Sequence, residues 1–563
     1  MLRKRKDRES EYCVFNHFDD NIPNNVVHLQ IHTKAIPAEA FRGYDILKDI
    51  EFVTGLEEIG ERSFKACISL ERITLPNSVR KINQGAFDGC INLKEVVLNE
   101  GLQEIGTRSF HGCDLEKIEM PSTIRVVGSW AFAHCKKLKR VALSENLQKI
   151  DQHVFYHCSS LETIEFPSQI TKIGKCSFEG CTELRNVVFN EGLLKIGIDA
   201  FERCISLESI TMSSTLSEIG EGSFSECKNL RTVAFNEGLK KIGEYAFYFC
   251  VSVETLKLPS TMTKIEDCAF QRCRSLRNAV LNEGLLEIGA AAFHGCTSLQ
   301  RITLPSTITD LDDSFLRGCT NLSEIQLGDK LQKIDESAFS RCKSLCNITL
   351  PSKITEVSMK TFSRCTNLQQ VNLNEGLKKI GVNAFNTCIS LECIKLPSTL
   401  IQIGECAFRN CSMLTKVMLN EGVETIADDA FRDCDVLRKF IFPHISSRLG
   451  VIFQSSNNTE TETVENKLDE IRGDLIERDG SEVFATGAAM NGGQNWDSIK
   501  QGIDKITSWI SYYEIKEATT ILELALWKWK LNEAMITSHT VERVLHRIDV
   551  PGPVKNIILE YLS

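Results

Sequence analysis

The chain lacks the long apolar runs that membrane-spanning helices require. No window of its 563 residues approaches 18 consecutive apolar residues. The N-terminus is basic at residues 3–6, but Asp7, Glu9 and Glu11 follow where a secretory signal would have an apolar stretch. The sequence therefore predicts neither a spanning helix nor an export signal. The basic run is interpreted as a solvated tail, with a nuclear-import patch as the alternative.

Motifs for common enzyme chemistry are also missing. The sequence contains no phosphate loop, no GxSxG nucleophile elbow and no HExxH motif. His134 and His157 stand beside Cys135 and Cys158, and imidazole together with thiolate can bind zinc. However, these cysteines are expected to point inward, and no compact CxxC pair accompanies them. We therefore predict a protein that is not an enzyme, with no catalytic residues, no metal and no cofactor.

Positive charge is in deficit. The net charge is −10 and the chain has only 12 prolines, with 42% hydrophobic and 25% charged residues. This is the composition of a folded protein, and an acidic balance disfavours nucleic-acid binding by bulk electrostatics. Cysteine, in contrast, is plentiful at 23. Without an export signal, we expect reduced thiols that act as small buried hydrophobes.

A phrase of Phe, then Cys three residues later and Leu three residues after that, repeats almost always at a step of 23 residues. The repeated Phe residues are Phe64, Phe87, Phe110, Phe132, Phe155, Phe178, Phe201, Phe224, Phe247, Phe270, Phe293, Phe315, Phe339, Phe362, Phe385, Phe408 and Phe431. A period of this length predicts a solenoid, because each repeat can bury its apolar face only against its neighbours. An atypical first coil keeps Phe41 but has Tyr44 in place of the Cys, as expected of a terminal cap.

Each repeat has the same internal order. A short Ile-x-Leu alternation, as at Ile73 and Leu75, predicts a half-buried strand, and the returning segment carries the Phe, which should fill the coil's interior. Alternate coils carry Pro or Asn-Glu-Gly after the strand, so the full unit is a 46-residue pair. The residue before the returning turn is Gly in 10 of 17 coils and Asn or Asp in four, which predicts a positive φ there. Glu266, Ser358 and Ala427 do not fit that explanation, so either those three turns differ or a positive φ is not required at this position.

The unit Leu-x-x-Ile-x-Leu-Pro-Ser-x-Ile-x-x-Ile-Gly-x-x-Ala-Phe-x-x-Cys, almost complete from Leu391 to Cys411, resembles the BspA-like (Treponema-type) leucine-rich repeats. The resemblance covers about residues 26–443. It implies a curved solenoid with a parallel sheet, and roles in protein binding and surface adhesion. It supplies no catalytic residues. The predicted fold class is α/β: a leucine-rich-repeat solenoid of about 18 coils with a small all-α module at the C-terminus.

The residue after the buried Ile of each strand should face outward on the sheet. From Val97 to Val280 every second coil gives this row a small apolar residue, and the row before the Ile is uncharged in the middle of the array. Such a surface suits a protein partner, although Thr and Val also appear in strands by simple preference. The predicted partner-binding residues are Val97, Glu119, Ala142, Glu165, Val188, Thr211, Ala234, Lys257 and Val280.

Periodicity stops near residue 443. We divide the chain into an N-terminal tail or cap (1–25), the solenoid (26–453), a flexible polar linker (454–463) and a helical C-terminal module (464–563), whose helical pattern begins with a charged segment near 464–478. Four of the five tryptophans lie in that module. They are interpreted as a small helical core, with Trp527 and Trp529 as a docking surface in the alternative reading.

These observations predict a cytoplasmic, non-enzymatic scaffold that presents its sheet to a protein partner of unknown identity. The nucleus is the alternative compartment. The alternative function is adhesion or recognition at the cell surface, which disulfides or glycans at Asn321 and Asn347 would support. Oligomeric state does not follow from the sequence.

Overall fold

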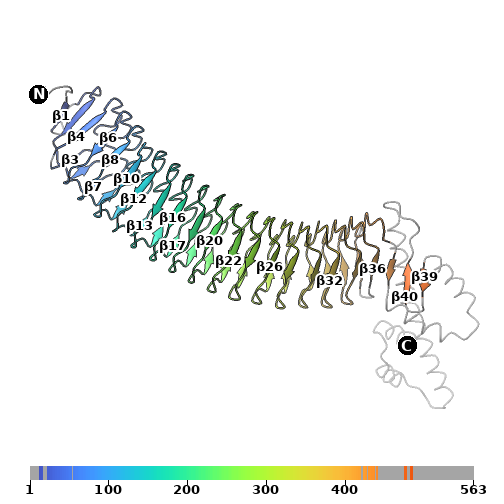
Figure 1. Ribbon diagram of the computed structural model, residues 1–563. Helices are drawn as coiled ribbons and strands as arrows, with labels where there is room; N and C mark the ends of the chain where they lie inside the picture. Colours follow the sequence, from blue (N-terminus) through green and yellow to red (C-terminus); the bar gives the residue numbers. More distant parts are fainter. Residues whose placement is uncertain are drawn as a thin grey trace, which may run out of the picture. The chain divides into compact units, whose positions relative to one another are not determined.

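The computed structural model describes residues 12–16, 22–53, 55–419, 423–427, 429–437, 439–441, 475–478 and 482–485. The chain divides into two compact units, Met1–Leu437 and Arg438–Ser563. The first unit is an elongated, gently curved solenoid of about 17 turns with a 23-residue period (Figure 1). Its described residues form strands and turns but no helix. The repeat architecture predicted from the sequence is confirmed, whereas the predicted helices fall mostly on residues outside the description.

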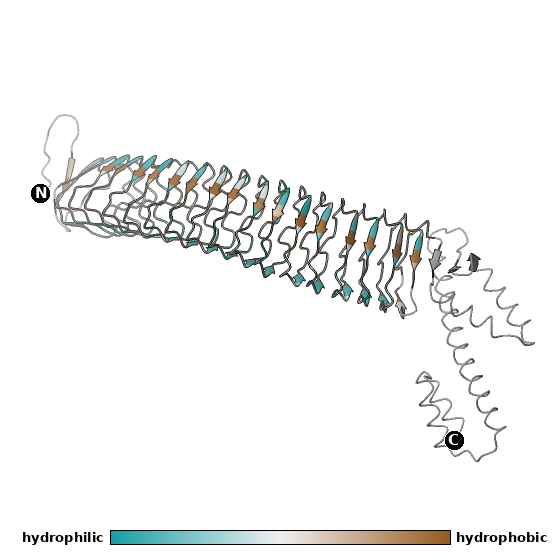
Figure 2. Ribbon diagram, turned by 60° about the horizontal axis from the view of Figure 1, so that its bottom comes forward, coloured by the Kyte–Doolittle hydropathy of each residue, from teal (hydrophilic) through white to brown (hydrophobic). Residues whose placement is uncertain are grey.

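Each coil has three sides. The first side carries a strand of three or four residues, and these strands together are called sheet A. The second side carries a strand of two residues, and these form sheet B. The third, called the turn side, is the segment around the repeated Phe. Figure 2 shows the two rows of strands along the body, with the apolar part of each sheet A strand in brown.

The bounds of the sheet A strands follow the chain. They are β1 (Tyr12–Phe15), β2 (His28–Ile31), β4 (Asp49–Phe52), β6 (Arg72–Thr74), β8 (Glu95–Val97), β10 (Lys117–Glu119), β12 (Arg140–Ala142), β14 (Thr163–Glu165), β16 (Asn186–Val188), β18 (Ser209–Thr211), β20 (Thr232–Ala234), β22 (Thr255–Lys257), β24 (Asn278–Val280), β26 (Arg301–Thr303), β28 (Glu324–Gln326), β30 (Asn347–Thr349), β32 (Gln370–Asn372), β34 (Cys393–Lys395) and β36 (Lys416–Met418).

Sheet B alternates with sheet A along the chain. Its strands are β3 (Ala35–Ile36), β5 (Glu58–Ile59), β7 (Lys81–Ile82), β9 (Glu104–Ile105), β11 (Val126–Val127), β13 (Lys149–Ile150), β15 (Lys172–Ile173), β17 (Lys195–Ile196), β19 (Glu218–Ile219), β21 (Lys241–Ile242), β23 (Lys264–Ile265), β25 (Glu287–Ile288), β27 (Asp310–Leu311), β29 (Lys333–Ile334), β31 (Glu356–Val357), β33 (Lys379–Ile380), β35 (Gln402–Ile403) and β37 (Thr425–Ile426).

Strands of successive coils pair in parallel, and equivalent residues face each other. Ile73 pairs with Val96 in sheet A, and Ile59 pairs with Ile82 in sheet B. The turn side has its own backbone ladder, since Phe64 N–H donates to the Ala86 carbonyl of the next coil at 2.8 Å. Hydrogen bonds on all three sides therefore satisfy backbone groups that would otherwise be buried without partners.

A stack of Phe rings fills the core. Phe41 and the Phe residues from Phe64 to Phe293, and again from Phe339 to Phe431, stack on one another with centroids 5.0–5.6 Å apart. The repeated Cys does more than fill space. Each of the 17 thiols donates to the carbonyl oxygen at the Phe position of the preceding coil, as Cys204 does to Phe178 at 3.2 Å. None of the cysteines forms a disulfide, and all 23 lie in the described part of the chain.

The stack is interrupted once. In the coil of Phe315, the ladder position belongs to Leu316, whose carbonyl accepts the hydrogen bond from the Cys342 thiol at 3.3 Å. Phe315 lies one place earlier and meets Phe293 edge-on, with 5.8 Å between ring centroids and 90° between planes. The Phe in this repeat therefore lies one place early, as its spacing of four residues from Cys319 in the sequence indicated.

The positive φ predicted for the glycine before the returning turn is wrong. None of the ten glycines at this position, such as Gly220 and Gly404, has a positive φ. Gly occupies this position because the backbones of neighbouring coils approach closely there. A Cβ on Gly220 would lie 2.7 Å from the carbonyl carbon of Gly197. Where Ser358 stands instead, its hydroxyl donates to the Ile334 carbonyl at 2.7 Å. This accounts for a residue that the positive-φ explanation did not fit.

Left-handed residues lie instead on either side of the Phe position. The residues two before and two after it have φ between 50° and 77° in the described coils, as at Arg62 and Ala66. Six coils place Gly at the second of these positions, among them Gly89 and Gly112. The recurring Phe-x-Gly-Cys phrase was therefore the signal for the left-handed turn.

The 46-residue double period follows from side chains that connect each coil of one type to the neighbouring coils of the other type. In Asn-Glu-Gly coils, the amide of Asn374 donates to the Pro351 carbonyl of the preceding coil at 2.7 Å. The carboxylate of Glu375 accepts from the backbone N–H and the hydroxyl of Ser398 in the following coil, both at 3.0 Å. A Pro-Ser coil and an Asn-Glu-Gly coil therefore fit each other better than two copies of either type would.

The first coils of the described solenoid differ from its middle. β1, in the region predicted as a tail or cap, pairs with β2 of the predicted solenoid, and the Tyr44 hydroxyl donates to the Ile22 carbonyl at 2.6 Å. In the second unit, β38 (Lys439–Ile441), β40 (Glu482–Ala485) and β39 (Leu475–Arg478) pair antiparallel. The helical pattern predicted for 464–478 is therefore wrong for Leu475–Arg478. The linker 454–463 lies outside the described residues.

Candidate binding surfaces

All nine residues predicted to bind a partner lie at the ends of sheet A strands β8 to β24. Eight of them are exposed, and Ala234 is half-buried. The exposed fraction is 45% at Val97 and 59% at both Val188 and Val280, which is high for large apolar side chains. Between these three valines stand Ala142 and Ala234, so small apolar residues recur at every second coil. Sheet A therefore presents these residues in one row along the body, in which neighbouring coils are about 4.8 Å apart.

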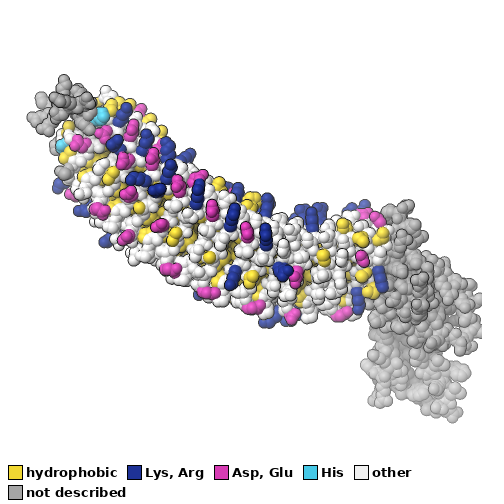
Figure 3. All heavy atoms as spheres, in the orientation of Figure 1, with side chains coloured by type: hydrophobic (Ala, Val, Ile, Leu, Met, Phe, Trp, Pro, Cys, Tyr) yellow, Lys and Arg dark blue, Asp and Glu magenta, His cyan; other side chains and the backbone are white. Residues whose placement is uncertain are grey.

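A second row on the same edge escaped the sequence reading. The residue two places before the buried Ile alternates in charge over ten successive coils and is exposed throughout. The alternating row is Glu71, Lys94, Glu116, Lys139, Glu162, Arg185, Glu208, Arg231, Glu254 and Arg277. Figure 3 shows blue and magenta side chains alternating in a line along the body. The alternation of charge is visible in the sequence at a spacing of 23 residues. It was missed because only the positions directly before and after the Ile were compared between repeats. Opposite charges on neighbouring strands favour the parallel pairing.

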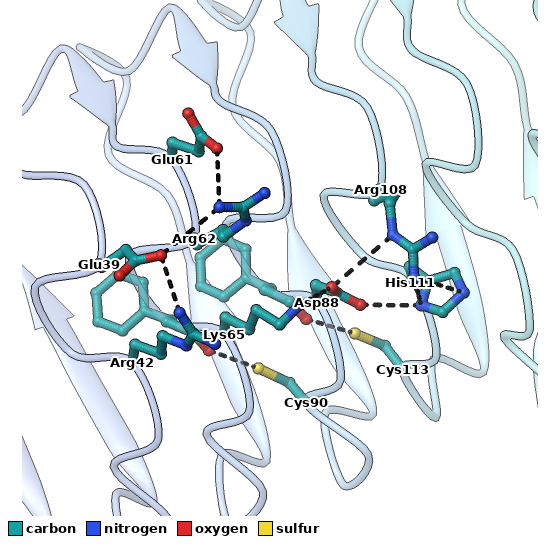
Figure 4. Close-up of polar contacts among 12 residues, drawn as sticks. Glu39, Arg42, Glu61, Arg62, Lys65, Asp88, Cys90, Arg108, His111 and Cys113 are labelled. Atoms are coloured by element: carbon teal, nitrogen blue, oxygen red, sulfur yellow. Dashed lines mark hydrogen bonds and ion pairs between the residues drawn. The ribbon is translucent and has the colours of Figure 1, made fainter.

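The turn side begins with an ion-pair cluster around Asp88. This buried carboxylate accepts from Lys65 at 2.7 Å and from His111 at 2.9 Å, with Arg108 at 3.9 Å (Figure 4). Burial raises the pKa of Asp88, but the hydrogen bonds and charges of His111 and Lys65 outweigh it and lower the pKa to about 2. The cluster joins three successive coils, so it stabilises the stack.

An aromatic and imidazole cluster follows. Trp130 stacks on His153 with 4.0 Å between ring centroids, and His134 stacks on His157 at 5.5 Å, with Tyr156 edge-on to both His134 and His157. Burial lowers the pKa of His134 and of His153. The neighbouring repeat cysteines are buried, and in the part of the chain that the structure describes no three His, Cys, Asp or Glu side chains group so as to hold a metal ion.

Carboxylates gather in the next coils of the turn side. Burial, together with the charges of Glu179 and Asp199, raises the pKa of Glu202 to about 7. The pKa of Asp199 is raised as well, by burial and by Glu179. Arg203 and Glu226 form an ion pair at 3.5 Å beside them. Negative charge is therefore concentrated where the aromatic cluster ends.

Two further predictions concern the tryptophans of the C-terminal module and membrane-spanning helices. Trp527 and Trp529 lie outside the described residues, and the docking role suggested for them stays a prediction. Among the described residues, no helix is long and apolar enough to cross a membrane.

The repeated strand, the parallel register and the ladder of turns define a leucine-rich-repeat solenoid. The family described as the BspA type leucine rich repeat region matches in six overlapping copies, over residues 15–139, 103–231, 148–277, 195–321, 263–392 and 333–460. The chain belongs to this family, as its repeat unit indicated.

Three of the solved structures that this chain resembles are leucine-rich repeat proteins of bacteria. A leucine-rich repeat protein from Bacteroides ovatus is 25% identical, with 78% of this chain and 97% of that protein covered and a TM-score of 0.47. The T. pallidum leucine rich repeat protein is 29% identical over 32% of this chain and 77% of its own, with a TM-score of 0.28. A leucine rich cell surface protein of Faecalibacterium prausnitzii is 20% identical over 62% and 79%, also with a TM-score of 0.28. No curated protein matches this chain.

Proposed function

We propose that this protein is a non-enzymatic scaffold that presents sheet A to a protein partner. The observation that carries the proposal is the row of exposed apolar residues at Val97, Val188 and Val280 on sheet A, with the uncharged Asn186 and Asn278 two places before the last two. Burial of such side chains against a partner gains about 25 cal/mol per Å² of apolar surface, and the charged residues of the row, such as Glu165 and Lys257, add a cost of desolvation that the partner's own charges must offset. A solenoid held by hydrogen bonds on three sides loses little conformational entropy on binding.

The test uses the full chain with Val188→Glu and Val280→Glu introduced together. Both residues are exposed, so the stability of the fold should change little, whereas a partner that covers sheet A would have to bury two unpaired carboxylates. We expect the partners retained by the wild-type chain in affinity purification from native cells to be lost from this variant. Circular dichroism and thermal unfolding check that the variant folds.

A matched control lies elsewhere on the same coils. Leu194 and Leu286 are 52% and 59% exposed, are also 92 residues apart, and precede sheet B strands. Leu194→Glu with Leu286→Glu introduces the same charge at the same spacing but should leave the partners bound. If this control loses the partners while the sheet A variant keeps them, the binding surface lies beside sheet B and the proposal is wrong.

The proposed site of action is the cytoplasm. Its support is the ladder of 17 repeat thiols that form no disulfide, a state that a reducing compartment maintains. Fractionation of native cells followed by mass spectrometry of the cysteines tests this part. Recovery of the chain at the cell surface, with glycans on Asn321 or Asn347, would favour the adhesion alternative instead.

A further inference from the structure

Beyond the carboxylate cluster, the turn side changes sign. One cationic or imidazole side chain comes from each of five successive coils, and together they are called the cationic row: Arg272, His294, Arg317, Arg341 and Arg364. Backbone hydrogen bonds hold these coils together, since Arg272 N–H donates to the His294 carbonyl at 2.7 Å and the Gly295 N–H donates to the Arg317 carbonyl at 2.8 Å. The pKa of His294 is lowered by burial and by the charges of Arg317, Arg272 and Arg341.

This row differs from those parts of the surface where ion pairs join neighbouring coils. Examples of such pairs are Lys264–Glu287 at 2.7 Å and Lys195–Glu218 at 2.8 Å. Among the described residues, no arginine of the cationic row forms an ion pair. Like charges on neighbouring coils repel each other, so the row lowers the stability of the stack. An anionic ligand would relieve that repulsion.

An aromatic residue marks the first end of the row. The Phe249 ring has Lys228, Arg272 and Arg274 at 5.6, 5.9 and 5.1 Å from its centroid. Phe249 itself has a φ of 58°, a conformation that a bulky residue rarely adopts. Its negative ring face attracts the three cations to one point at this end of the row.

The extent of the row limits the ligand. Five coils at about 4.8 Å span about 19 Å, the length of six extended residues. Acidic residues occur on the turn side before the row, at Glu202 and Glu226, and after it at Asp433. Inside the row, Asp313 is exposed and its charge acts on His294 against those of the arginines. A long nucleic acid or an anionic membrane surface would meet all of these carboxylates, whereas a short acidic segment would meet Asp313 at most. We propose that the cationic row binds an extended acidic segment of a protein partner, on a side of the coil distinct from sheet A.

Hexaglutamate labelled with fluorescein is the probe, with hexaglutamine as its uncharged counterpart. In fluorescence anisotropy with the full chain at about 50 mM salt, we expect the acidic peptide to bind and the uncharged one not to bind. Arg317→Glu with Arg341→Glu should weaken binding at least about tenfold. Should that variant fail to fold, Arg317→Gln with Arg341→Gln removes the same charges and should weaken binding by about threefold or more.

The matched control is Lys172→Glu with Lys353→Glu, which changes the net charge by the same amount. Both lysines are exposed, and neither forms an ion pair among the described residues. This variant should bind hexaglutamate within about twofold of the wild type.

Three outcomes would overturn the proposal. They are the absence of hexaglutamate binding, an equal loss in the control variant, and tighter binding of a short oligothymidine that depends on the same arginines. The last outcome would make the row a nucleic-acid site. None of these results bears on the sheet A proposal, which its own variants test.

Discussion

Phe201 offers a direct test of the ring stack. Its side chain is fully buried, and its ring stacks on Phe178 at 5.1 Å and Phe224 at 5.3 Å, with Phe189 edge-on at 5.8 Å. Removing a buried Phe side chain costs about 3–5 kcal/mol. Each aromatic pair adds about 0.5–1.5 kcal/mol beyond area burial, which favours the upper end of that range. We therefore expect Phe201→Ala to destabilise the fold by about 4–5 kcal/mol.

Phe201→Leu serves as the control, because the chain already contains Leu316 at an equivalent place. It retains most of the apolar volume and loses the stacking of the ring, so we expect a cost of about 1–2 kcal/mol. The difference between the two variants then separates the contribution of the cavity from that of ring stacking.

Urea unfolding followed by circular dichroism gives the free energies, and hydrogen exchange with mass spectrometry locates the effect. A solenoid is stabilised coil by coil, so protection should fall around residues 178–224 and remain in coils near residue 400. A cost below about 1 kcal/mol for Phe201→Ala, or equal costs for both variants, would refute the reasoning.

Two further predictions concern charge and thiol chemistry. Because the pKa of Asp88 is lowered to about 2 in the fold, the stability that it contributes is complete above its unfolded pKa of about 4 and is lost as the pH falls towards 2. The stability difference between the wild type and Asp88→Asn should therefore shrink over that window in urea unfolding, and a constant difference would contradict the assignment. Iodoacetamide should modify the exposed Cys393 in the native protein, whereas ladder thiols such as Cys365, whose pKa burial raises to about 12, should react only after unfolding. Equal labelling rates in peptide mass spectra would show that the ladder opens in the native state.

The spacing of Phe and Cys determined the architecture. A 23-residue phrase whose apolar positions all need cover can bury them only by stacking, so the solenoid, its strands and its interior Phe followed from the sequence. The outward row of sheet A was predicted as well, because strand side chains alternate strictly between faces. Val188 and Val280 are exposed as that alternation requires.

Contacts between coils required the tertiary structure. Gly220 was assigned a positive φ from its residue type, yet its requirement comes from the backbone of the preceding coil, 23 residues away. In the same way, the Cys204 thiol was expected to be a simple hydrophobe, but it donates to the carbonyl of Phe178. Local patterns specify which side chains are buried, and they do not specify which atoms of the next coil those side chains meet.

The cationic row illustrates the same limit on the surface. Its members occupy two different positions of the repeat, such as Arg272 two places after the Phe and His294 one place after it, so no single column of the sequence contains them. Periodicity alone determined that this protein is a solenoid. Only the stacking of coils, which brings residues 23 apart within about 5 Å, decided which charges form ion pairs and which do not.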